Sequence, residues 1–409
     1  MEAVWRHCLI LTVVTTWAGV CVTHAKQTKW PLYSQTPVLL VWNAPTQDCA
    51  PRHGVTLPLD QFDIVASPNE GFVRQNLTIF YKERLGLYPY YERDGTAVNG
   101  GLPQLASLSE HYDKMPEGVQ KYIREPGTKG LAVIDWEEWR PLWIRNWDSK
   151  DIYRNCYNHD YRNGLKNYTG RCPTLEMGRN DQLNWLWMEC TALFPSIYMG
   201  SVLRSTHYGR LFVRNRVKEA MRLASVGDGL ARPVFVYTRP TYISQMALLT
   251  ETDLVSTIGE SIALGVEGVI FWGDSSYSSD SSCSALKDYL NGALGRYLLN
   301  VSTAAQQCSR ARCNLHGRCL RSQPDDDAYL HLSPSTHSFS RQGGRLKVSG
   351  EPGEAELALF RQHFQCQCYT GYQGEACALR AKGQNKAPSV LGTWSLCFLL
   401  PLGLLTLLQ

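Results

Sequence analysis

Residues 130–141 read Gly-Leu-Ala-Val-Ile-Asp-Trp-Glu-Glu-Trp-Arg-Pro, and this stretch decides how the rest of the chain is interpreted. Four apolar residues, Leu131 to Ile134, lead directly into two acids, Asp135 and Glu137. An unbroken apolar run of this kind is typical of a strand that is buried on both faces. On a strand, residues two positions apart lie on the same side. The stretch therefore predicts a buried strand over 131–136 that aims both carboxyl groups into one cleft.

Further runs of Val, Ile and aromatic residues resemble this one, and helical stretches lie between several of them. The predicted strands cover 38–42, 77–81, 131–136, 196–199, 234–238 and 266–272. The predicted helices cover 118–123, 181–193, 211–224 and 251–264. This alternation predicts an α/β fold, a (β/α) TIM-like barrel, over residues 26–300. Active sites of such barrels lie at the carboxyl ends of the strands. The candidate residues at those ends are Tyr81, Asp135, Glu137, Tyr198, Arg239, Trp272 and Asp274.

The two acids suit acid–base chemistry. Like charges held close together raise the pKa of one of them, so one carboxyl can stay protonated and act as an acid. Exposed aromatic rings in a cleft stack on sugar faces, and four tryptophans accompany the pair: Trp136, Trp139, Trp143 and Trp147. The alternative is a pair of solvated loop acids over an aromatic core. The motif alone favours neither interpretation.

Both ends of the chain predict the secretory pathway. Residues 1–25 have the short apolar core and small residues of a signal peptide. Residues 381–409 combine small residues, a polar spacer and an apolar tail, which is the pattern of a GPI-anchor signal; the alternative is a single membrane helix. We expect the extracellular face of the cell membrane, through a lipid anchor, with the lysosome as a second location. The net charge of +4 is too small to predict nucleic acid as a partner.

The fourteen cysteines also fit an oxidising compartment. Three lie in the predicted signal and tail; the remaining eleven are an odd number, so at least one stays unpaired. The last six lie within residues 301–380 and resemble an EGF-like module, with a long polar insert at 324–356 that is expected at the surface. The pairing of such modules implies Cys308–Cys319, Cys313–Cys366 and Cys368–Cys377.

Two further predictions concern modification and metal binding. Three Asn-x-Ser/Thr triplets predict glycosylation at Asn76, Asn167 and Asn300. The cysteine spacing does not fit a zinc site, and we expect neither a metal nor another cofactor.

From about Pro37 to Leu379 the chain resembles the hyaluronidases of glycoside hydrolase family 56, and its tail makes it similar to the GPI-anchored members. Besides residues 130–141, the resemblance is carried by Val-Trp-Asn-Ala-Pro-Thr (41–46), Ile-Phe-Tyr-Lys-Glu-Arg-Leu-Gly-Leu-Tyr-Pro-Tyr-Tyr (79–91), Gly-Gly-Leu-Pro-Gln (100–104) and Phe-Pro-Ser-Ile-Tyr-Met (194–199). Residues 180–187 and 256–265 add two further matching segments.

The resemblance implies a hydrolase that cleaves the β-1,4 bonds of hyaluronan with retention of configuration. In this family the N-acetyl oxygen of the substrate replaces the enzymic nucleophile. Glu137 is then the proton donor and later the base, and Asp135 stabilises the charged intermediate. The implied substrate contacts are those of Tyr198 with the N-acetyl group, Trp272 behind it, Tyr81 with the sugar at the cleavage site, and Arg140, which steadies the carboxylates. Arg239 is a further predicted substrate-binding residue. The family also implies the disulfides Cys49–Cys283 and Cys156–Cys172.

The chain departs from the family after Arg154. Family members continue there with a long helix and a barrel strand, whereas residues 155–180 contain no apolar run that could form a strand. Roughly 60–70 residues, about two strand–helix lengths, are missing. We therefore expect a barrel that lacks one strand and has impaired activity. The alternative is a catalytically inactive isoform that binds hyaluronan or acts in adhesion at the cell surface. The sequence does not identify a protein partner.

Overall fold

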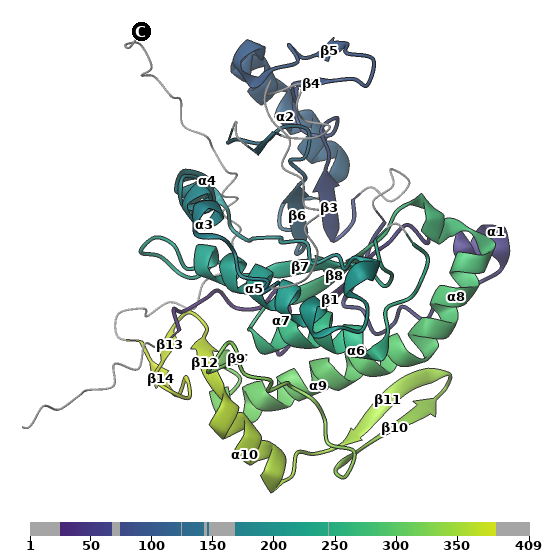
Figure 1. Cartoon of the computed structure of the whole chain (residues 1–409), viewed down its shortest axis with the longest axis vertical. Helices are drawn as coiled ribbons and strands as arrows, with labels where there is room; N and C mark the ends of the chain where they lie inside the picture. Colours follow the sequence, from purple (N-terminus) through teal and green to yellow (C-terminus); the bar gives the residue numbers. More distant parts are fainter. Residues whose placement is uncertain are drawn as a thin grey trace, which may run out of the picture.

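The computed structural model describes residues 25–67, 74–123, 125–142, 145–146, 168–243 and 245–381. Its largest sheet has four parallel strands in the order β2 (Ile64–Val65), β1 (Leu39–Asn43), β8 (Gly268–Trp272) and β7 (Phe235–Thr238), and lies in the middle of the molecule (Figure 1). In the register of this sheet, Asn43 lies opposite Trp272. The last residues of β1 and β8 are therefore neighbours at the carboxyl edge.

A second parallel sheet consists of β3 (Leu77–Phe80) and β6 (Leu131–Ile134), which lie above the larger sheet in Figure 1. These two sheets confirm five of the six predicted strands, with small shifts at their ends. The two-residue strand β2 was not predicted.

The predicted strand at 196–199 is wrong in extent. Residues 193–197 instead lie along β7 and make isolated parallel bridges at Leu193 and Ser196. Pro195 lies between the two bridges and has no N–H to donate, so the ladder is interrupted there. The main-chain N–H of Tyr237 still donates to Pro195 O (2.9 Å), and that of Ile197 donates to Tyr237 O (2.8 Å). This segment forms one margin of the larger sheet.

Alternate residues of the strands face one buried apolar cluster, which we call the inner cluster. It takes side chains from both sheets: Leu39, Val41, Ile64, Ala66, Leu77, Ile79, Val133, Phe235, Tyr237 and Ile270. The intervening residues of the larger sheet, among them Leu40, Val236 and Val269, pack outward into a second cluster with the helices. Burial on both faces is the arrangement expected of a parallel α/β fold. Among the described residues no backbone ladder joins the two sheets, so the strands do not close into a continuous barrel.

The main helices cover the outer face and begin with side-chain caps in several places. They are α2 (Leu108–Tyr122), α5 (His207–Ala224), α6 (Glu251–Leu254), the π-helical turn η6 (Val255–Gly259), α7 (Glu260–Ala263), α8 (Asp280–Asn291) and α9 (Ala293–Cys313). Ser107, Thr250 and Ser279 cap α2, α6 and α8 by accepting a bond from a main-chain N–H of the first turn. The shorter elements are α1 (Cys49–His53), α3 (Thr174–Asp181), α4 (Asn184–Glu189), β4 (Tyr90–Tyr91), β5 (Ala97–Val98), η2 (Pro103–Leu105), η5 (Ser201–Leu203) and η7 (Ser275–Ser278).

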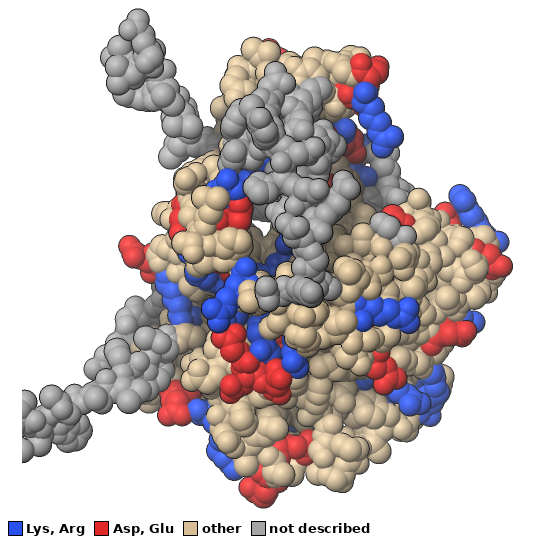
Figure 2. Space-filling view, viewed as in Figure 1, with Lys and Arg blue, Asp and Glu red and all other residues tan. Residues whose placement is uncertain are grey.

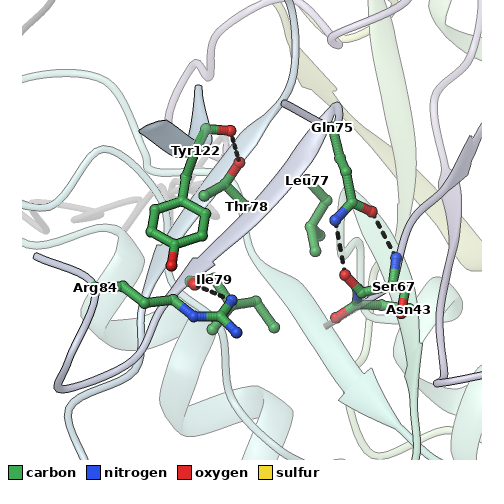
Figure 3. Close-up of a pocket in the computed structure, with 8 residues that line it drawn as sticks. All are labelled: Asn43, Ser67, Gln75, Leu77, Thr78, Ile79, Arg84 and Tyr122. Atoms are coloured by element: carbon green, nitrogen blue, oxygen red, sulfur yellow. Dashed lines mark hydrogen bonds between the residues drawn. The ribbon is translucent and has the colours of Figure 1, made fainter. Parts of the chain in front are cut away.

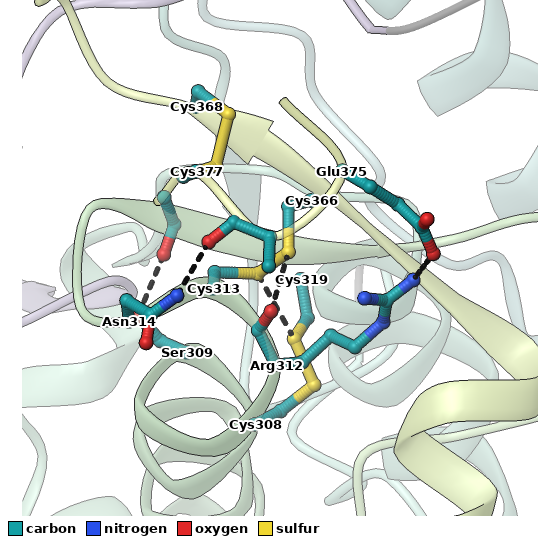
Figure 4. Close-up of a disulfide and its surroundings, with 12 residues drawn as sticks. Cys308, Ser309, Arg312, Cys313, Asn314, Cys319, Cys366, Cys368, Glu375 and Cys377 are labelled. Atoms are coloured by element: carbon teal, nitrogen blue, oxygen red, sulfur yellow. Dashed lines mark hydrogen bonds and ion pairs between the residues drawn. A yellow bond between two sulfur atoms is a disulfide. The ribbon is translucent and has the colours of Figure 1, made fainter. Parts of the chain in front are cut away.

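A C-terminal module, defined here as residues 314–381, follows α9 directly. It contains β9 (Gly317–Arg321) paired with β12 (Phe364–Cys368), the hairpin β10 (His337–Gln342) and β11 (Arg345–Gly350), α10 (Glu354–His363), and β13 (Tyr372–Gln373) paired with β14 (Leu379–Arg380). Disulfides join Cys308 to Cys319, Cys313 to Cys366 and Cys368 to Cys377, the pairs implied by the EGF-like resemblance (Figure 4).

Two features of this module differ from expectation. The expected boundary at residue 300 falls inside α9, so the connection between the two parts is a continuous helix. The insert at 324–356 is also only partly at the surface, because Leu330 and Leu332 are buried in the second cluster, which the larger sheet forms with the helices. The hairpin β10–β11 is the exposed portion.

Buried charges and the N-terminal segment tie the module to the α/β domain. Glu260 of α7, which is fully buried, accepts bonds from Arg214 of α5 (2.7 Å) and from Arg321 of β9. Thr28 lies between the two parts: its hydroxyl donates to Ala231 O (3.0 Å), and its main-chain N–H donates to Cys368 O (3.0 Å). At the surface, basic and acidic side chains are interspersed on the face drawn in Figure 2.

Several predictions fall on residues outside the described ranges. They are the signal peptide up to residue 24, the tail from residue 382, Trp143, Trp147, Cys156 and Asn167. Within the described ranges, no helix has the length and apolar character needed to span a bilayer.

Candidate active site

The carboxylates of the opening motif follow β6. The main-chain N–H of Asp135 donates to Phe80 O (3.0 Å), which extends the pairing with β3 by one residue. Because Val133 belongs to the inner cluster, the alternation of the strand places Asp135 on the same inner side. Asp135 is half-buried and Glu137, two residues on, is exposed. The pair therefore lies where the apolar interior gives way to solvent.

Two tyrosines lie near the acids. Burial is the main cause that raises the pKa of Tyr198, and the charges of Asp135 and Glu137 raise it further against the opposing effect of Arg239. Burial likewise raises the pKa of Tyr81, with smaller contributions from the same two acids and an opposing hydrogen bond to Trp272. Both hydroxyls consequently stay protonated and remain hydrogen-bond donors at neutral and acidic pH.

The aromatic wall of the site comes from β8. The ring of Trp272, the last residue of β8, stacks on the ring of Tyr198 with centroids 5.9 Å apart and planes at 26°. Both side chains pack against the inner cluster. The structure thus brings Tyr81, Asp135, Glu137, Tyr198 and Trp272 together from four separate segments of the chain.

Arg140 contacts the main chain of the motif. Its guanidinium donates to Glu137 O (2.9 Å) and to Trp136 O (3.4 Å), while its main-chain N–H donates to Asn146 Oδ1 (2.6 Å). These bonds shape the loop that carries Glu137. These contacts of Arg140 are with the backbone of the motif, and its expected effect on the carboxylates stays a prediction.

The third acid of the motif and its tryptophans have other partners. Glu138 pairs with Lys82 (3.3 Å), whose ammonium also lies 3.8 Å from the centroid of the Tyr90 ring. The rings of Trp136 and Trp139 meet edge to face at 4.7 Å. The loop after β6 therefore rests on aromatic packing, and its third acid, Glu138, is held in an ion pair.

The sequence interpretation missed two residues that face this region. Tyr237 is buried, belongs to the inner cluster, and its hydroxyl has no hydrogen-bond partner among the described residues. Burial raises its pKa well above the ordinary value, and nearby Tyr198, Tyr81 and Asp135 add to this. The side-chain amide of Asn43, at the end of β1, is also buried without a partner in the described part of the chain. The alternation of β1 and β7 is the signal that could have identified both.

Asn43 lines a small pocket between the ends of β1 and β3 (Figure 3). The side chain of Gln75 bridges this gap by accepting from Ser67 N (2.6 Å) and donating to Ser67 O (2.8 Å). On the other side, the guanidinium of Arg84 donates to Ile79 O (3.3 Å). The full lining is Asn43, Ser67, Gln75, Leu77, Thr78, Ile79, Arg84 and Tyr122. The pocket marks the point where the two sheets meet without a shared ladder.

The remaining predicted residues are the disulfide cysteines and the glycosylation sites. A disulfide joins Cys49 to Cys283, across 234 residues, as the resemblance implied. Cys172 is half-buried, and its expected partner lies outside the described residues. Asn300 is part of α9, where its side chain accepts a bond from Leu332 N (3.0 Å), and Asn76 is half-buried just before β3. Among the described residues no group of three or more His, Cys, Asp or Glu side chains is placed to share a metal ion.

This arrangement suits general acid–base chemistry on a sugar. It offers one exposed carboxyl group, one half-buried carboxyl group, protonated phenols as donors, and an indole face for stacking. Arg239 also lies at this edge, with its guanidinium 5.3 Å from the centroid of the Trp272 ring and paired with Asp274.

Comparison with known proteins agrees with this chemistry. The hyaluronidase model of glycoside hydrolase family 56 matches residues 27–155 and 155–381. Human hyaluronidase-2 is 44% identical over 434 aligned positions that cover 90% of each chain, and a hyaluronidase from Echis ocellatus is 38% identical over 92% of this chain and 98% of its own. Since 90% of 409 residues is about 368, about 66 positions of the human alignment hold no residue of this chain.

A solved structure supports the fold. Bee venom hyaluronidase in complex with a hyaluronic acid tetramer superposes with a TM-score of 0.50 at 23% identity, over 64% of this chain and 98% of that one. This likeness concerns the α/β fold alone. The family model that matches most of the chain and the 44% identity to human hyaluronidase-2 lead to one conclusion: the chain belongs to the hyaluronidase family, glycoside hydrolase family 56.

Proposed function

We propose that the site hydrolyses the β-1,4 bonds of hyaluronan by substrate-assisted catalysis with retention of configuration. The observation that carries this proposal is the convergence of Asp135 and Glu137 with Tyr198 and Trp272 at the carboxyl ends of the strands. Family membership supplies the substrate class. The family is an exception to the two-carboxylate scheme, since the N-acetyl oxygen of the substrate attacks the anomeric carbon.

The two carboxyl groups then have different tasks. Glu137, which is exposed, protonates the leaving glycosidic oxygen and afterwards takes a proton from the attacking water. Asp135, which is half-buried, faces the positive charge that develops on the ring formed by the N-acetyl group. The protonated hydroxyl of Tyr198 can donate to that group, and Trp272 packs behind it.

We infer that a missing segment limits this activity. The two parts of the family match meet at residue 155, and the human relative has about 66 aligned positions without a counterpart here. In the described part of the chain β6 pairs only with β3, and Ile134 on its outer face is 55% exposed. A strand and helix inserted after residue 155 would cover both that edge and that face. Their absence leaves the cleft incomplete on one side.

Four proteins test both parts of the proposal: the present chain, a chain with the relatives' segment restored after residue 155, and the Glu137→Gln variant of each. We expect the restored chain to cleave hyaluronan faster than the present chain, and Glu137→Gln to abolish cleavage in both, a loss of at least about 100-fold. Cleavage that survives Glu137→Gln would refute the assigned role. Equal rates for the present and restored chains would refute the inferred impairment.

A second candidate function is hyaluronan binding without hydrolysis. The stacked pair of Tyr198 and Trp272 favours it, because these rings can hold a sugar even when the cleft is incomplete. The same four proteins discriminate between the two functions. Retention of hyaluronan oligosaccharides by the present chain, with no cleavage, would identify it as a binding protein.

We also propose that a GPI anchor holds the protein at the extracellular face of the membrane and that the C-terminal module is EGF-like. The cysteine order supports the module, and the small residues, spacer and apolar tail of 381–409 support the anchor. Release from intact cells by a phosphatidylinositol-specific phospholipase is the expected result. Retention after that treatment would favour a membrane helix. Cys156–Cys172 and glycans at Asn76, Asn167 and Asn300 remain predictions that peptide mapping can test.

A further inference from the structure

Arg239 lies at the mouth of the site and is only 8% exposed. It follows β7 in the same alternation as Phe235 and Tyr237, which belong to the inner cluster. Its guanidinium pairs with the carboxylate of Asp274, two residues beyond the end of β8. A buried guanidinium needs such a partner, because an isolated charge at this depth is strongly destabilising.

The partner of Arg239 is itself held in place. Asp274 Oδ1 accepts bonds from Ser276 N (3.1 Å) and Ser276 Oγ (2.5 Å), while Oδ2 faces Arg239. Burial alone would raise the pKa of Asp274, but the bonds from Ser276 and Arg239 outweigh it and hold that pKa below the ordinary value. Asp274 therefore stays ionised into the acidic range, and its charge neutralises Arg239 throughout.

Arg239 is predicted to bind substrate, and this neutralisation argues against a contact of its guanidinium with a substrate carboxylate. A uronate would have to displace a carboxylate that the protein already holds at contact distance. The planar guanidinium also lies over two aromatic rings, with 5.3 Å to the centroid of Trp272 and 5.6 Å to that of Tyr277. Arginine stacks in this way on aromatic faces while it keeps an in-plane ion pair.

Trp272 also contacts two residues of the site. Its ring stacks on Tyr198 at 5.9 Å, and its side chain hydrogen-bonds with Tyr81. Trp272 is thus enclosed between the Arg239–Asp274 pair and the two tyrosines nearest the catalytic acids.

We propose that Arg239 is a positioning residue: together with Asp274 it fixes the plane of the Trp272 indole against Tyr198, and so sets the surface on which the N-acetyl sugar rests. This role builds on the proposed hydrolase function for its effect on turnover. The orientation of Trp272, however, can be measured whether or not the chain hydrolyses hyaluronan.

The test uses the full chain labelled with 5-fluorotryptophan, in which Trp272→Phe identifies the resonance of Trp272 among the twelve tryptophans. We expect Arg239→Gln and Asp274→Asn each to shift or broaden that resonance, and Arg239→Lys to restore it in part. The double variant should change it little more than either single variant, because the two side chains act as a unit. Arg345→Gln is the control, since Arg345 pairs with Asp60 (3.3 Å) on the exposed hairpin.

Turnover gives the second readout, measured on the restored chain if the present one is inactive. Arg239→Gln should lower kcat about tenfold and change KM less than about twofold, the result of a misplaced sugar surface rather than a lost substrate contact. A raised KM with unchanged kcat would make Arg239 a substrate-binding residue and overturn the proposal. An unchanged Trp272 resonance in both Arg239→Gln and Asp274→Asn would also overturn it. Absence of hydrolysis in every chain bears on the proposed function alone, because the resonance still decides the role of Arg239.

Discussion

At the residue scale, the sequence could predict those site residues that end an apolar run with a polar or aromatic side chain. Asp135 and Trp272 stand out in this way, and the structure brings both to one edge. Tyr237 could not be found so easily, because it lies inside an apolar run that is composed like core, whereas Asn43 ends such a run and was overlooked. Their unsatisfied polar atoms become visible only when the neighbouring strands are in place. The role of Arg239 needed its partner Asp274, which is 35 residues away.

Tyr237→Phe tests whether the buried hydroxyl serves the site. A buried hydroxyl without a protein partner destabilises the fold by about 1–3 kcal/mol, so its removal should leave the free energy of unfolding unchanged or raise it. If the hydroxyl donates to bound hyaluronan, affinity for its oligosaccharides should fall about 3- to 10-fold on loss of that hydrogen bond. Calorimetric titration and thermal unfolding give the two quantities.

Tyr289→Phe is the matched control for this prediction. The hydroxyl of Tyr289 is equally buried but donates to Leu249 O (2.6 Å), so its removal should destabilise the protein by about 1 kcal/mol and leave affinity unchanged. If Tyr237→Phe destabilised the fold as much as the control and spared affinity, the hydroxyl would have a structural role.

At the element scale, the sequence predicts strands well where a strand pairs with a neighbour on each side, and less well at the edges of the sheet. The strand ending at Trp272 agrees with prediction because β1 and β7 both hold it. The segment at 193–197 was misplaced because Pro195 removes one ladder donor, an effect that hydrophobicity does not reveal. The two-residue strand β2 is too short to leave a pattern. The sequence did not predict that β3 and β6 form a sheet separate from the larger one. It predicted only that a neighbouring strand is missing, because no strand-like run follows residue 155.

Two neighbouring residues of β6 test that missing neighbour. Ile134→Ser should change the free energy of unfolding by less than about 0.5 kcal/mol in the present chain, because the side chain is 55% exposed. Val133→Ala, which empties space in the inner cluster, should cost roughly 1–3 kcal/mol.

The same two substitutions in the restored chain complete the test. There Ile134→Ser should become as costly as Val133→Ala, since a new strand and helix would bury the outer face of β6. Denaturant unfolding measures all four variants. A small cost for Ile134→Ser in both backgrounds would mean that the added segment does not pack on β6.

At the scale of the whole molecule, the C-terminal module is held by long-range contacts that no local sequence pattern predicts. Glu260 joins Arg214 and Arg321 across 46 and 61 residues of sequence. The insert was expected to lie at the surface, yet its residues 328–332 pack against α9 and η6 because they carry Tyr329, Leu330 and Leu332 among polar neighbours. Short apolar runs inside long polar inserts are easily overlooked, and here one of them contains a histidine, His331.

His331 makes this packing sensitive to acid. Its Nε2 hydrogen-bonds with the hydroxyl of Tyr297 (2.9 Å), its ring stacks on Tyr329 at 5.4 Å, and burial lowers its pKa below the ordinary 6.5. Below about pH 6.5 the unfolded chain therefore binds a proton that the folded chain does not bind. The free energy of unfolding consequently decreases as the pH falls. Glu260 lies near the two tyrosines, and Arg210 and Arg321 lie near Tyr329.

His331→Gln keeps a hydrogen-bonding side chain toward Tyr297 but does not titrate. The variant should lose less thermal stability than the wild type between pH 7.5 and pH 5, as followed by the melting temperature. His53→Gln, which replaces an imidazole bonded to Ser278 O (2.9 Å), is the control. Parallel pH profiles for the wild type and His331→Gln would show that His331 does not cause the acid sensitivity.

The position of Thr28 has a consequence for the order in which the molecule is assembled during synthesis. Its main-chain N–H is satisfied by Cys368 O, and its carbonyl accepts from Thr370 N (2.8 Å), which is 342 residues further along the chain, so both partners leave the ribosome much later than Thr28. At about 5–20 residues per second, the first described residues wait for tens of seconds without their final neighbours. Enzymes that modify this segment therefore meet it before it has packed between the α/β domain and the C-terminal module.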